Sequence, residues 1–272
     1  MTVVEANGAR IPAIGLGTMT LKEAAGVELI AHALKLGYRH LDTAQAYGNE
    51  REVGEALRAS GVPREQVFIT TKIFRDRLEP GEFERAMDES LERLQVPFVD
   101  LVLIHWPNPD VPLPGTIASL CSVKRAGKTK NIGVSNFTVA LLEEATRIAD
   151  EKIATNQIEV HPFIDQSKVM TACKSHGMAV TAYCPIARGH VPGNETLTRI
   201  GKAHGKTPAQ VSLRYLVQQG MVVIPRSSNK ERLAENLAID DFTLTAAEMA
   251  EISKLKKPDG RVVNPAFAPK WD

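Results

Sequence analysis

The sequence has few cysteines, no long apolar run and no sign of a targeting segment. Its three cysteines, Cys121, Cys173 and Cys184, are odd in number and form no C-x-x-C pair, which argues against a disulfide framework and a structural zinc site. No run of about 18 apolar residues occurs, and the first residues lack the basic and apolar regions of a signal peptide. We therefore expect reduced thiols in a soluble, cytoplasmic protein.

Charged residues and histidines also lack informative clusters. The 33 Lys and Arg residues nearly balance the 32 Asp and Glu residues, and the basic ones are spread along the chain. This distribution gives no electrostatic reason to expect binding to nucleic acid or to a membrane surface. The seven histidines form neither a His-x-His nor a His-Glu-x-x-His motif, so we expect no metal site. The sequence therefore favours a small-molecule partner.

What the chain does contain is a regular alternation of short apolar runs with segments of helical periodicity. Val27, Ile30 and Leu34 have the spacing of one helix face, as do Phe83 and Met87. The apolar runs predict eight strands, at Ala13–Leu16, Tyr38–Leu41, Val67–Thr71, Val99–Ile104, Asn131–Val134, Thr155–Ile158, Ala179–Ala182 and Val222–Ile224. Strand–helix alternation favours parallel strands joined by right-handed crossovers.

Eight such repeats with no second domain predict an α/β fold in the form of a closed barrel. The 272 residues also match the roughly 250 that are typical of a (β/α)8, or TIM, barrel. We expect one domain over residues 1–272, with an amino-terminal β-hairpin that turns at Asn7-Gly8. The last residues, from Lys257 to Asp272, predict a non-helical tail.

Polar residues follow three consecutive predicted strands, where the working residues of such barrels lie. Asp42 and Tyr47 follow the second strand, Lys72 the third and His105 the fourth. A buried lysine needs a partner, which Asp42 can supply, and a nearby ammonium would let Tyr47 ionise below its usual pKa of about 10. Taken singly, these residues could be a structural ion pair, a packed aromatic and a core histidine. Together they predict a site for proton transfer to a substrate oxygen.

Two further motifs concern phosphate binding. Gly15-Leu16-Gly17-Thr18 lacks the third glycine of a dinucleotide-binding fingerprint, so a tight turn at the barrel mouth is the better interpretation. The segment after the last strand contains Arg226, Ser227, Ser228 and Arg232, and we expect its serines to cap the helix that follows. It predicts a phosphate clamp, because loops at this place in a barrel often hold phosphate, and the alternative is an ordinary capped helix with solvated arginines.

The chain resembles the aldo-keto reductases in three segments that span most of its length. Residues 37–54, the run from Ile132 to Phe137 and the segment from Ile224 to Ile239 are similar to the three signatures of that superfamily. Within it, His-Trp-Pro at 105–107 and the run from Ala154 to Pro162 resemble bacterial 2,5-diketo-D-gluconate reductases of the B type, which also reduce methylglyoxal.

The resemblance implies a monomeric barrel that binds NADPH without a Rossmann domain and reduces aldehydes and ketones to alcohols. Asp42, Tyr47, Lys72 and His105 match the catalytic tetrad, with Tyr47 as proton donor. The residues that match cofactor-binding positions are Ser135, Asn136 and Gln157 for the nicotinamide carboxamide, Tyr183 for stacking on its ring, Pro185 and Ile186 near the pyrophosphate, and Arg226, Ser227, Ser228, Arg232, Glu235 and Asn236 for the 2′-phosphate and adenine.

The expected substrate is a small dicarbonyl such as methylglyoxal or 2,5-diketo-D-gluconate. Phe74, Trp106 and Phe163 are expected to line the pocket together with His105, and the short tail is expected to add little apolar wall. Two alternatives stay open beside this function. A non-catalytic NADPH-binding module is disfavoured by the intact tetrad, and a metal-dependent barrel hydrolase would require several ligands at strand ends.

Overall fold

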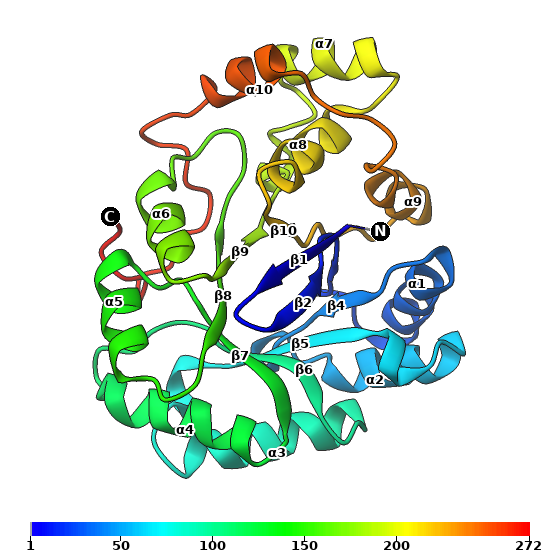
Figure 1. Ribbon diagram of the computed structural model, residues 1–272. Coiled ribbons are helices and arrows are strands. Elements are labelled where there is room, and N and C mark those ends of the chain that lie inside the picture. The colour runs from blue at the N-terminus through cyan, green and yellow to red at the C-terminus, as the bar shows by residue number, and fades with distance from the viewer. Residues whose placement is uncertain (1) are drawn as a thin grey trace.

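A closed barrel of eight parallel strands forms the centre of the computed structural model, which describes residues 2–272 (Figure 1). The strands are β3 (Leu16–Gly17), β4 (His40–Asp42), β5 (Phe68–Ile73), β6 (Val99–Ile104), β7 (Thr129–Ser135), β8 (Ile153–Glu159), β9 (Ala179–Tyr183) and β10 (Val222–Val223). Each pairs in parallel with the next. The barrel closes where Gly15 N donates to Val223 O and Val223 N donates to Ala13 O, both at 2.8 Å. The predicted fold is confirmed.

Helices surround the barrel and bury the predicted apolar faces against it (Figure 1). They are α1 (Glu23–Leu36), α2 (Glu50–Ser60), α3 (Glu82–Leu94), α4 (Leu113–Arg125), α5 (Val139–Ile148), α6 (Ser167–Ser175), α7 (Glu195–His204), α8 (Pro208–Val217), α9 (Lys230–Leu237) and α10 (Ala246–Ser253). Ile30 and Leu34 of α1 and Phe83 and Met87 of α3 are fully buried, as the helical spacing predicts.

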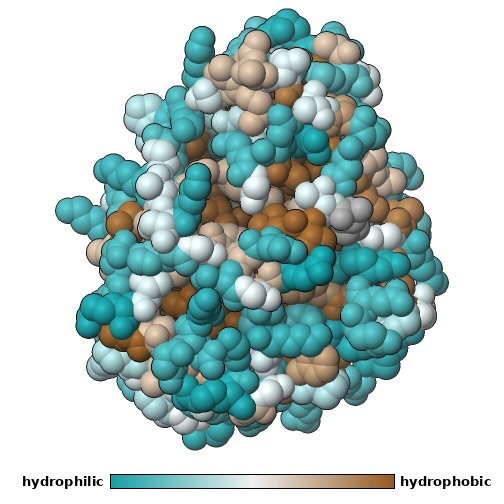
Figure 2. Space-filling model, in the orientation of Figure 1, coloured by the Kyte–Doolittle hydropathy of each residue, from teal (hydrophilic) through white to brown (hydrophobic). Residues whose placement is uncertain are grey.

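A β-hairpin covers the amino-terminal end of the barrel. Strands β1 (Val3–Ala6) and β2 (Ala9–Pro12) are antiparallel, and Asn7 and Gly8 turn between them with φ of 47° and 88°. Asn7 Nδ2 donates to the carbonyl of Ile153, at the start of β8, over 2.8 Å. Figure 1 shows the hairpin in front of the strands, and Figure 2 shows that this face is largely hydrophilic with small, separate apolar areas. The carboxyl ends of the strands therefore lie at the opposite end.

The Gly15–Gly17 segment forms the seam of the barrel. A Cβ at Gly17 would lie 2.9 Å from the carbonyl oxygen of Ile224, and a Cβ at Gly15 would lie 3.1 Å from Cγ2 of the same residue. These glycines therefore allow close approach of the first and last strands. The expected turn comes directly afterwards, where Leu21 N donates to Thr18 O at 2.8 Å.

The segment after α10 contains no helix or strand up to Asp272, which confirms the predicted tail. It ends beside α5 and α6 (Figure 1). The three cysteines are free, with Cys121 and Cys173 buried and Cys184 partly buried. No helix among residues 2–272 has the length and apolar character that a membrane crossing requires.

Candidate active site

The structure brings Asp42, Tyr47 and Lys72 into direct contact at the carboxyl end of the barrel. Asp42 ends β4, Tyr47 lies in the 3₁₀ turn Gln45–Tyr47, and Lys72 lies in β5 beside β4. The side chain of Lys72 is fully buried, and its Nζ lies 2.5 Å from Asp42 Oδ1 and 3.4 Å from Tyr47 Oη. A buried ammonium requires such partners, because burial without them is very unfavourable.

His105 completes this cluster directly after β6. Its ring lies edge-on to that of Tyr47, with 5.7 Å between centroids, and its backbone N donates to Ile73 O at 2.9 Å. Burial and the charge of Lys72 hold the pKa of His105 well below its usual value. The imidazole is therefore neutral at neutral pH. Its buried Nδ1 has no hydrogen-bond partner within residues 2–272.

Burial changes the expected titration of Tyr47. It raises the pKa of the phenol above its usual value, although the Lys72 ammonium acts in the opposite direction. The expectation of easier ionisation is therefore wrong in its net direction, because the sequence shows the neighbouring charge but not the degree of burial. Burial also opposes the charge on Lys72, but Asp42 and Tyr47 outweigh it and raise the Lys72 pKa. At neutral pH the cluster thus contains a charged amine and a protonated phenol.

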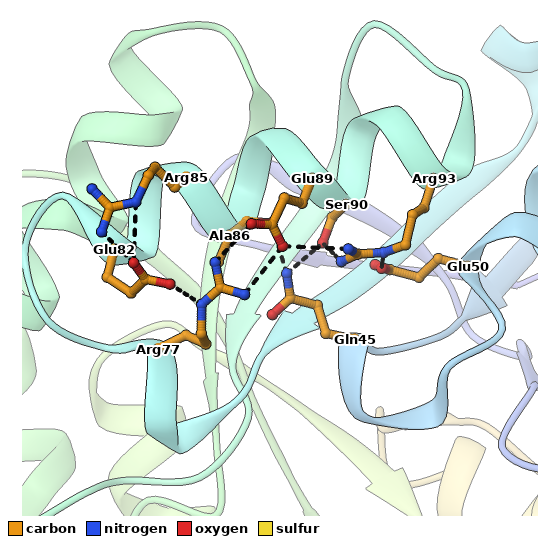
Figure 3. Close-up of polar contacts among 9 residues, drawn as sticks. All are labelled: Gln45, Glu50, Arg77, Glu82, Arg85, Ala86, Glu89, Ser90 and Arg93. Atoms are coloured by element: carbon orange, nitrogen blue, oxygen red, sulfur yellow. Dashed lines mark hydrogen bonds and ion pairs between the residues drawn. The ribbon is translucent and has the colours of Figure 1, made fainter.

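Contacts with helix α3 hold the turn that carries Tyr47 (Figure 3). Gln45, which begins this turn, donates from Nε2 to Ala86 O at 2.6 Å and to Ser90 Oγ at 3.0 Å. Both acceptors belong to α3. The phenol is thus tied to a helix as well as to its strand end.

Glu50, at the start of α2, holds the chain just after this turn. One carboxylate oxygen accepts from Thr71 Oγ1 at 2.5 Å, and the other accepts from Arg93 Nε at 2.7 Å. Thr71 precedes Lys72, so Glu50 connects the segment after Tyr47 to the strand that carries the lysine. The ion pairs continue from Arg93 along α3 through Glu89 (Figure 3). Sequence reasoning missed this support, because charged residues on a helix usually face solvent.

The predicted nicotinamide residues lie next to the tetrad and are bonded to it. Gln157 Nε2 donates to the second oxygen of Asp42 at 2.7 Å, and Ser135 Oγ donates to Gln157 O at 2.8 Å. Asn136 has a left-handed backbone with φ of 62°, which asparagine tolerates. Its Oδ1 accepts from Tyr183 Oη at 2.8 Å. Strands β4, β7, β8 and β9 therefore contribute to one polar network.

The loop after β10 provides cationic side chains near the same rim. Arg226 and Arg232 are exposed, and neither forms an ion pair within residues 2–272. Arg226 donates to Thr20 Oγ1. Asn229, rather than a serine, caps α9, because its side chain accepts from Arg232 N at 2.8 Å. The expected serine cap is wrong, since the Ser227 hydroxyl instead bonds the backbone of Asn229.

The remaining predicted cofactor residues are close to these elements. Pro185 is buried and Ile186 partly buried just after β9, whereas Ser228 and Glu235 are exposed and Asn236 is buried on or near α9. Among residues 2–272, no group of three or more His, Cys, Asp or Glu side chains could hold a metal ion.

A chain of aromatic contacts begins at His105, and two of its members come from the tail. Phe74 lies edge-on to His105 with 5.6 Å between centroids, and Phe267 contacts both Phe74 at 6.0 Å and Trp106 at 5.4 Å. Trp271 also contacts Trp106, at 6.2 Å. The expectation that the tail adds little apolar wall is therefore wrong. Its aromatic residues were a usable signal in a chain with only 5% aromatics.

Phe163, the remaining predicted wall residue, lies where the tail begins. Its ring packs against His161, with 5.9 Å between centroids. Its carbonyl oxygen accepts from Lys257 N at 2.9 Å, where the tail begins. Phe163 thus supports the tail.

The closed barrel and the acid–amine–phenol cluster at its carboxyl end define a reductase of the aldo-keto type, and comparison with known proteins agrees. Residues 13–257 match the model of the aldo/keto reductase family. The chain belongs to this family.

Several relatives match along nearly the whole chain. Methylglyoxal reductase DkgB of Salmonella typhimurium is 42% identical over 265 residues, covering 96% of this chain and 99% of the relative. Glyoxal reductase of Bacillus subtilis is 40% identical over 265 residues, covering 97% of this chain and 96% of the relative. A crystal structure provisionally assigned as a 2,5-diketo-D-gluconic acid reductase B is 50% identical, with a TM-score of 0.98 and coverage of 100% and 98%. An aldo-keto reductase of Bombyx mori in complex with NADP is 33% identical, with a TM-score of 0.89 and coverage of 97% and 95%.

Proposed function

We propose that this protein reduces aldehydes and ketones to alcohols with NADPH, and that Tyr47 is the proton donor. The observation that carries this proposal is the buried chain of contacts from Asp42 through Lys72 to Tyr47, beside a neutral His105. NADPH, when bound, supplies the hydride that reduces the carbonyl carbon. The residues of the chain align the carbonyl and deliver the proton.

Tyr47 suits the role of a general acid because burial keeps its phenol protonated at neutral pH. When its proton passes to the substrate oxygen, negative charge develops on the phenol oxygen. The Lys72 ammonium lies 3.4 Å away and stabilises that charge, and Asp42 in turn keeps the ammonium charged. A charge that is already in place requires no rearrangement during the reaction.

His105 suits the role of orienting the carbonyl oxygen. A neutral imidazole donates one hydrogen bond from one ring nitrogen, and the low pKa keeps the ring neutral. Its ring lies beside that of Tyr47, so both groups can approach one substrate oxygen. Phe74 packs on the other side of the imidazole and limits its movement.

The side chains along the rim fit a nicotinamide dinucleotide with a 2′-phosphate. Arg226 and Arg232 are exposed and lack acidic partners within residues 2–272, so both are available for a phosphate dianion. At the other end of the ligand, Asn136, Gln157 and Tyr183 would hold the nicotinamide, which places it beside Tyr47 and His105. The NADP complex of the Bombyx mori relative supports this choice of cofactor.

A small dicarbonyl is the substrate class that we propose. The names of the relatives include methylglyoxal reductase and glyoxal reductase. The aromatic enclosure made by Phe74, Trp106 and Phe267 also favours a compact substrate. We further propose that the protein acts as a monomer in the cytoplasm.

The test is NADPH oxidation, followed by absorbance, with methylglyoxal, 2,5-diketo-D-gluconate, simple aldehydes and a steroid ketone. We expect turnover with the small dicarbonyls at the highest kcat/KM. Tight NADPH binding without oxidation by any carbonyl compound would instead indicate a non-catalytic binding module. A higher kcat/KM for the steroid than for methylglyoxal would refute the proposed substrate class.

A further inference from the structure

We infer that Glu159 is a positioning residue that anchors the carboxy-terminal tail and thereby sets which carbonyl compounds reach His105. This inference rests on the proposed function for its effect on substrate choice, but not for the anchoring itself. Glu159 belongs to the run from Ala154 to Pro162, and the proposed mechanism uses only Gln157 of that run. Gln157 and Glu159 lie two positions apart in β8 and so project to the same side of the strand.

The carboxylate of Glu159 is fully buried and receives the tail directly. One oxygen accepts from Val262 N at 2.6 Å, and the other accepts from Val263 N at 2.9 Å. His161 Nε2 lies 2.9 Å from the first oxygen, and Arg261 Nη1 lies 3.9 Å from the second. A buried carboxylate is very unfavourable without such donors, so release of the tail would leave it poorly satisfied. The tail amides likewise depend on it, because no helix or strand pairs them.

Steric fit shows that the tail is seated closely at this anchor. A Cβ at Gly260 would lie 1.8 Å from the carbonyl oxygen of Phe163, so no other residue fits there without moving the backbone. Lys257 N donates to the same carbonyl at 2.9 Å. Two tail segments, at 257–260 and 262–263, are therefore held by β8 and the loop after it.

The anchored tail places aromatic side chains over the pocket. Arg261 stacks on Trp271 with 3.7 Å from its guanidinium carbon to the ring centroid, and Trp271 Nε1 donates to Asn264 Oδ1 at 2.9 Å. Phe267, between these points, contacts Trp106 and Phe74. Phe267 is 37% exposed, so the aromatic cover is held by the anchor rather than by burial in the core. Loss of the anchor would open the pocket without removing any residue of the tetrad.

Glu159→Gln is the direct test. A glutamine has the same shape, but its NH₂ group would face one of the two backbone N–H donors, which leaves that donor unpaired. Asp100→Asn is the matched control, because Asp100 is also a buried carboxylate that accepts a backbone N–H, from Ile69, but at the other end of the barrel. Gly260→Ala loosens the tail without any change of charge. Phe267→Ala removes the cover while leaving the anchor intact.

Tail release is measured first, without reference to activity. Trypsin can cut the tail after Arg261 and Lys270, and mass spectrometry gives the rate. We expect Glu159→Gln and Gly260→Ala to raise this rate at least tenfold over wild type and Asp100→Asn, with the barrel still folded by circular dichroism. If trypsin cut the tail of Glu159→Gln no faster than that of wild type, the anchoring role of Glu159 would be refuted. This outcome does not depend on which reaction the protein catalyses.

Substrate choice is measured second, as kcat and KM for methylglyoxal and for a bulky aromatic aldehyde. We expect Glu159→Gln, Gly260→Ala and Phe267→Ala to shift the kcat/KM ratio toward the bulky aldehyde by roughly tenfold, which a few apolar pocket contacts can achieve. The change for methylglyoxal should lie mainly in KM, with NADPH affinity retained. A released tail with an unchanged ratio would overturn the role in specificity. If wild type showed no turnover, the proposed function would be refuted. The trypsin result would still test whether Glu159 anchors the tail.

Discussion

The strand-end cluster and the carboxy-terminal tail contact each other through Phe74 but are held in place by different means. Lys72 is fully buried in β5, and its polar partners all belong to the strand-end segment 42–47. The tail has no helix or strand after Ser253, and it is fixed by Glu159 and by the start of α5. The proposed reaction is therefore tied to the barrel framework, whereas the proposed control of substrate choice depends on a segment outside any helix or strand.

Tyr47→Phe should show the largest effect in the strand-end cluster. The variant keeps the ring beside His105 but removes the hydroxyl that we propose as the proton donor. General acid catalysis contributes roughly 10²–10⁴-fold, so kcat should fall by that factor while the dissociation constant for NADPH changes little. Steady-state kinetics and fluorescence titration of NADPH measure the two quantities. Wild-type kcat in this variant would remove Tyr47 from the mechanism.

Lys72→Met tests how the cluster controls the phenol. In the proposed mechanism reduction requires protonated Tyr47, so kcat/KM should fall as pH rises through the Tyr47 pKa. The Lys72 charge lowers that pKa, so its removal should move the falling limb to higher pH. The variant also leaves Asp42 buried without its cation, at a cost of about 3–5 kcal/mol in the free energy of unfolding.

Asp42→Asn is the matched variant for this pH measurement. The negative charge of Asp42 raises the Tyr47 pKa, so its removal should move the limb to lower pH, opposite to Lys72→Met. The pH profiles of kcat/KM decide between the two directions. Shifts of the same sign in both variants would show that rearrangement, rather than charge, dominates.

The loop after β10 belongs neither to the strand-end cluster nor to the tail. Its arginines should therefore affect only the choice between NADPH and NADH. NADH would lose two or three charged contacts of about 1.5–3 kcal/mol each, so NADPH should bind roughly 10²-fold more tightly or better. The double variant Arg226→Ala, Arg232→Ala should remove most of this preference by weakening NADPH, with NADH little changed. Lys230→Ala is the control, because Lys230 is exposed nearby but already paired with Glu28. Equal binding of both cofactors by wild type would make the loop an ordinary capped helix.

The strand-end residues could be predicted because their positions follow from local patterns. Asp42, Lys72 and His105 each come at or near the end of an apolar run, and parallel strands in a barrel bring such ends to one rim. The tail contacts could not be predicted in this way. Glu159 bonds amides about a hundred positions further along, and no periodicity relates the two segments. The net pKa shift of Tyr47 was also out of reach, because it depends on how deeply the packed structure buries the phenol.

The smallest expected effect concerns the second fixed point of the tail. The Asp272 carboxylate accepts from Val139 N, at the start of α5, over 3.0 and 3.3 Å. A negative charge at a helix amino terminus contributes about 0.3–1 kcal/mol when exposed, so Asp272→Asn should speed trypsin cleavage of the tail by only about 2- to 5-fold. The methylglyoxal KM should rise by no more than that factor, with kcat unchanged.

Salt and a matched variant separate this contact from the Glu159 anchor. The effect of Asp272→Asn should shrink as ionic strength rises, because salt screens an exposed charge, whereas the effect of Glu159→Gln should persist. Asp150→Asn is the control, since Asp150 is an exposed aspartate just beyond the other end of α5 and does not contact the tail. If Asp272→Asn released the tail as fully as Glu159→Gln, the tail would be held at its end rather than at β8. The proposed contrast between the buried anchor at Glu159 and the weak contact at Asp272 would then be wrong.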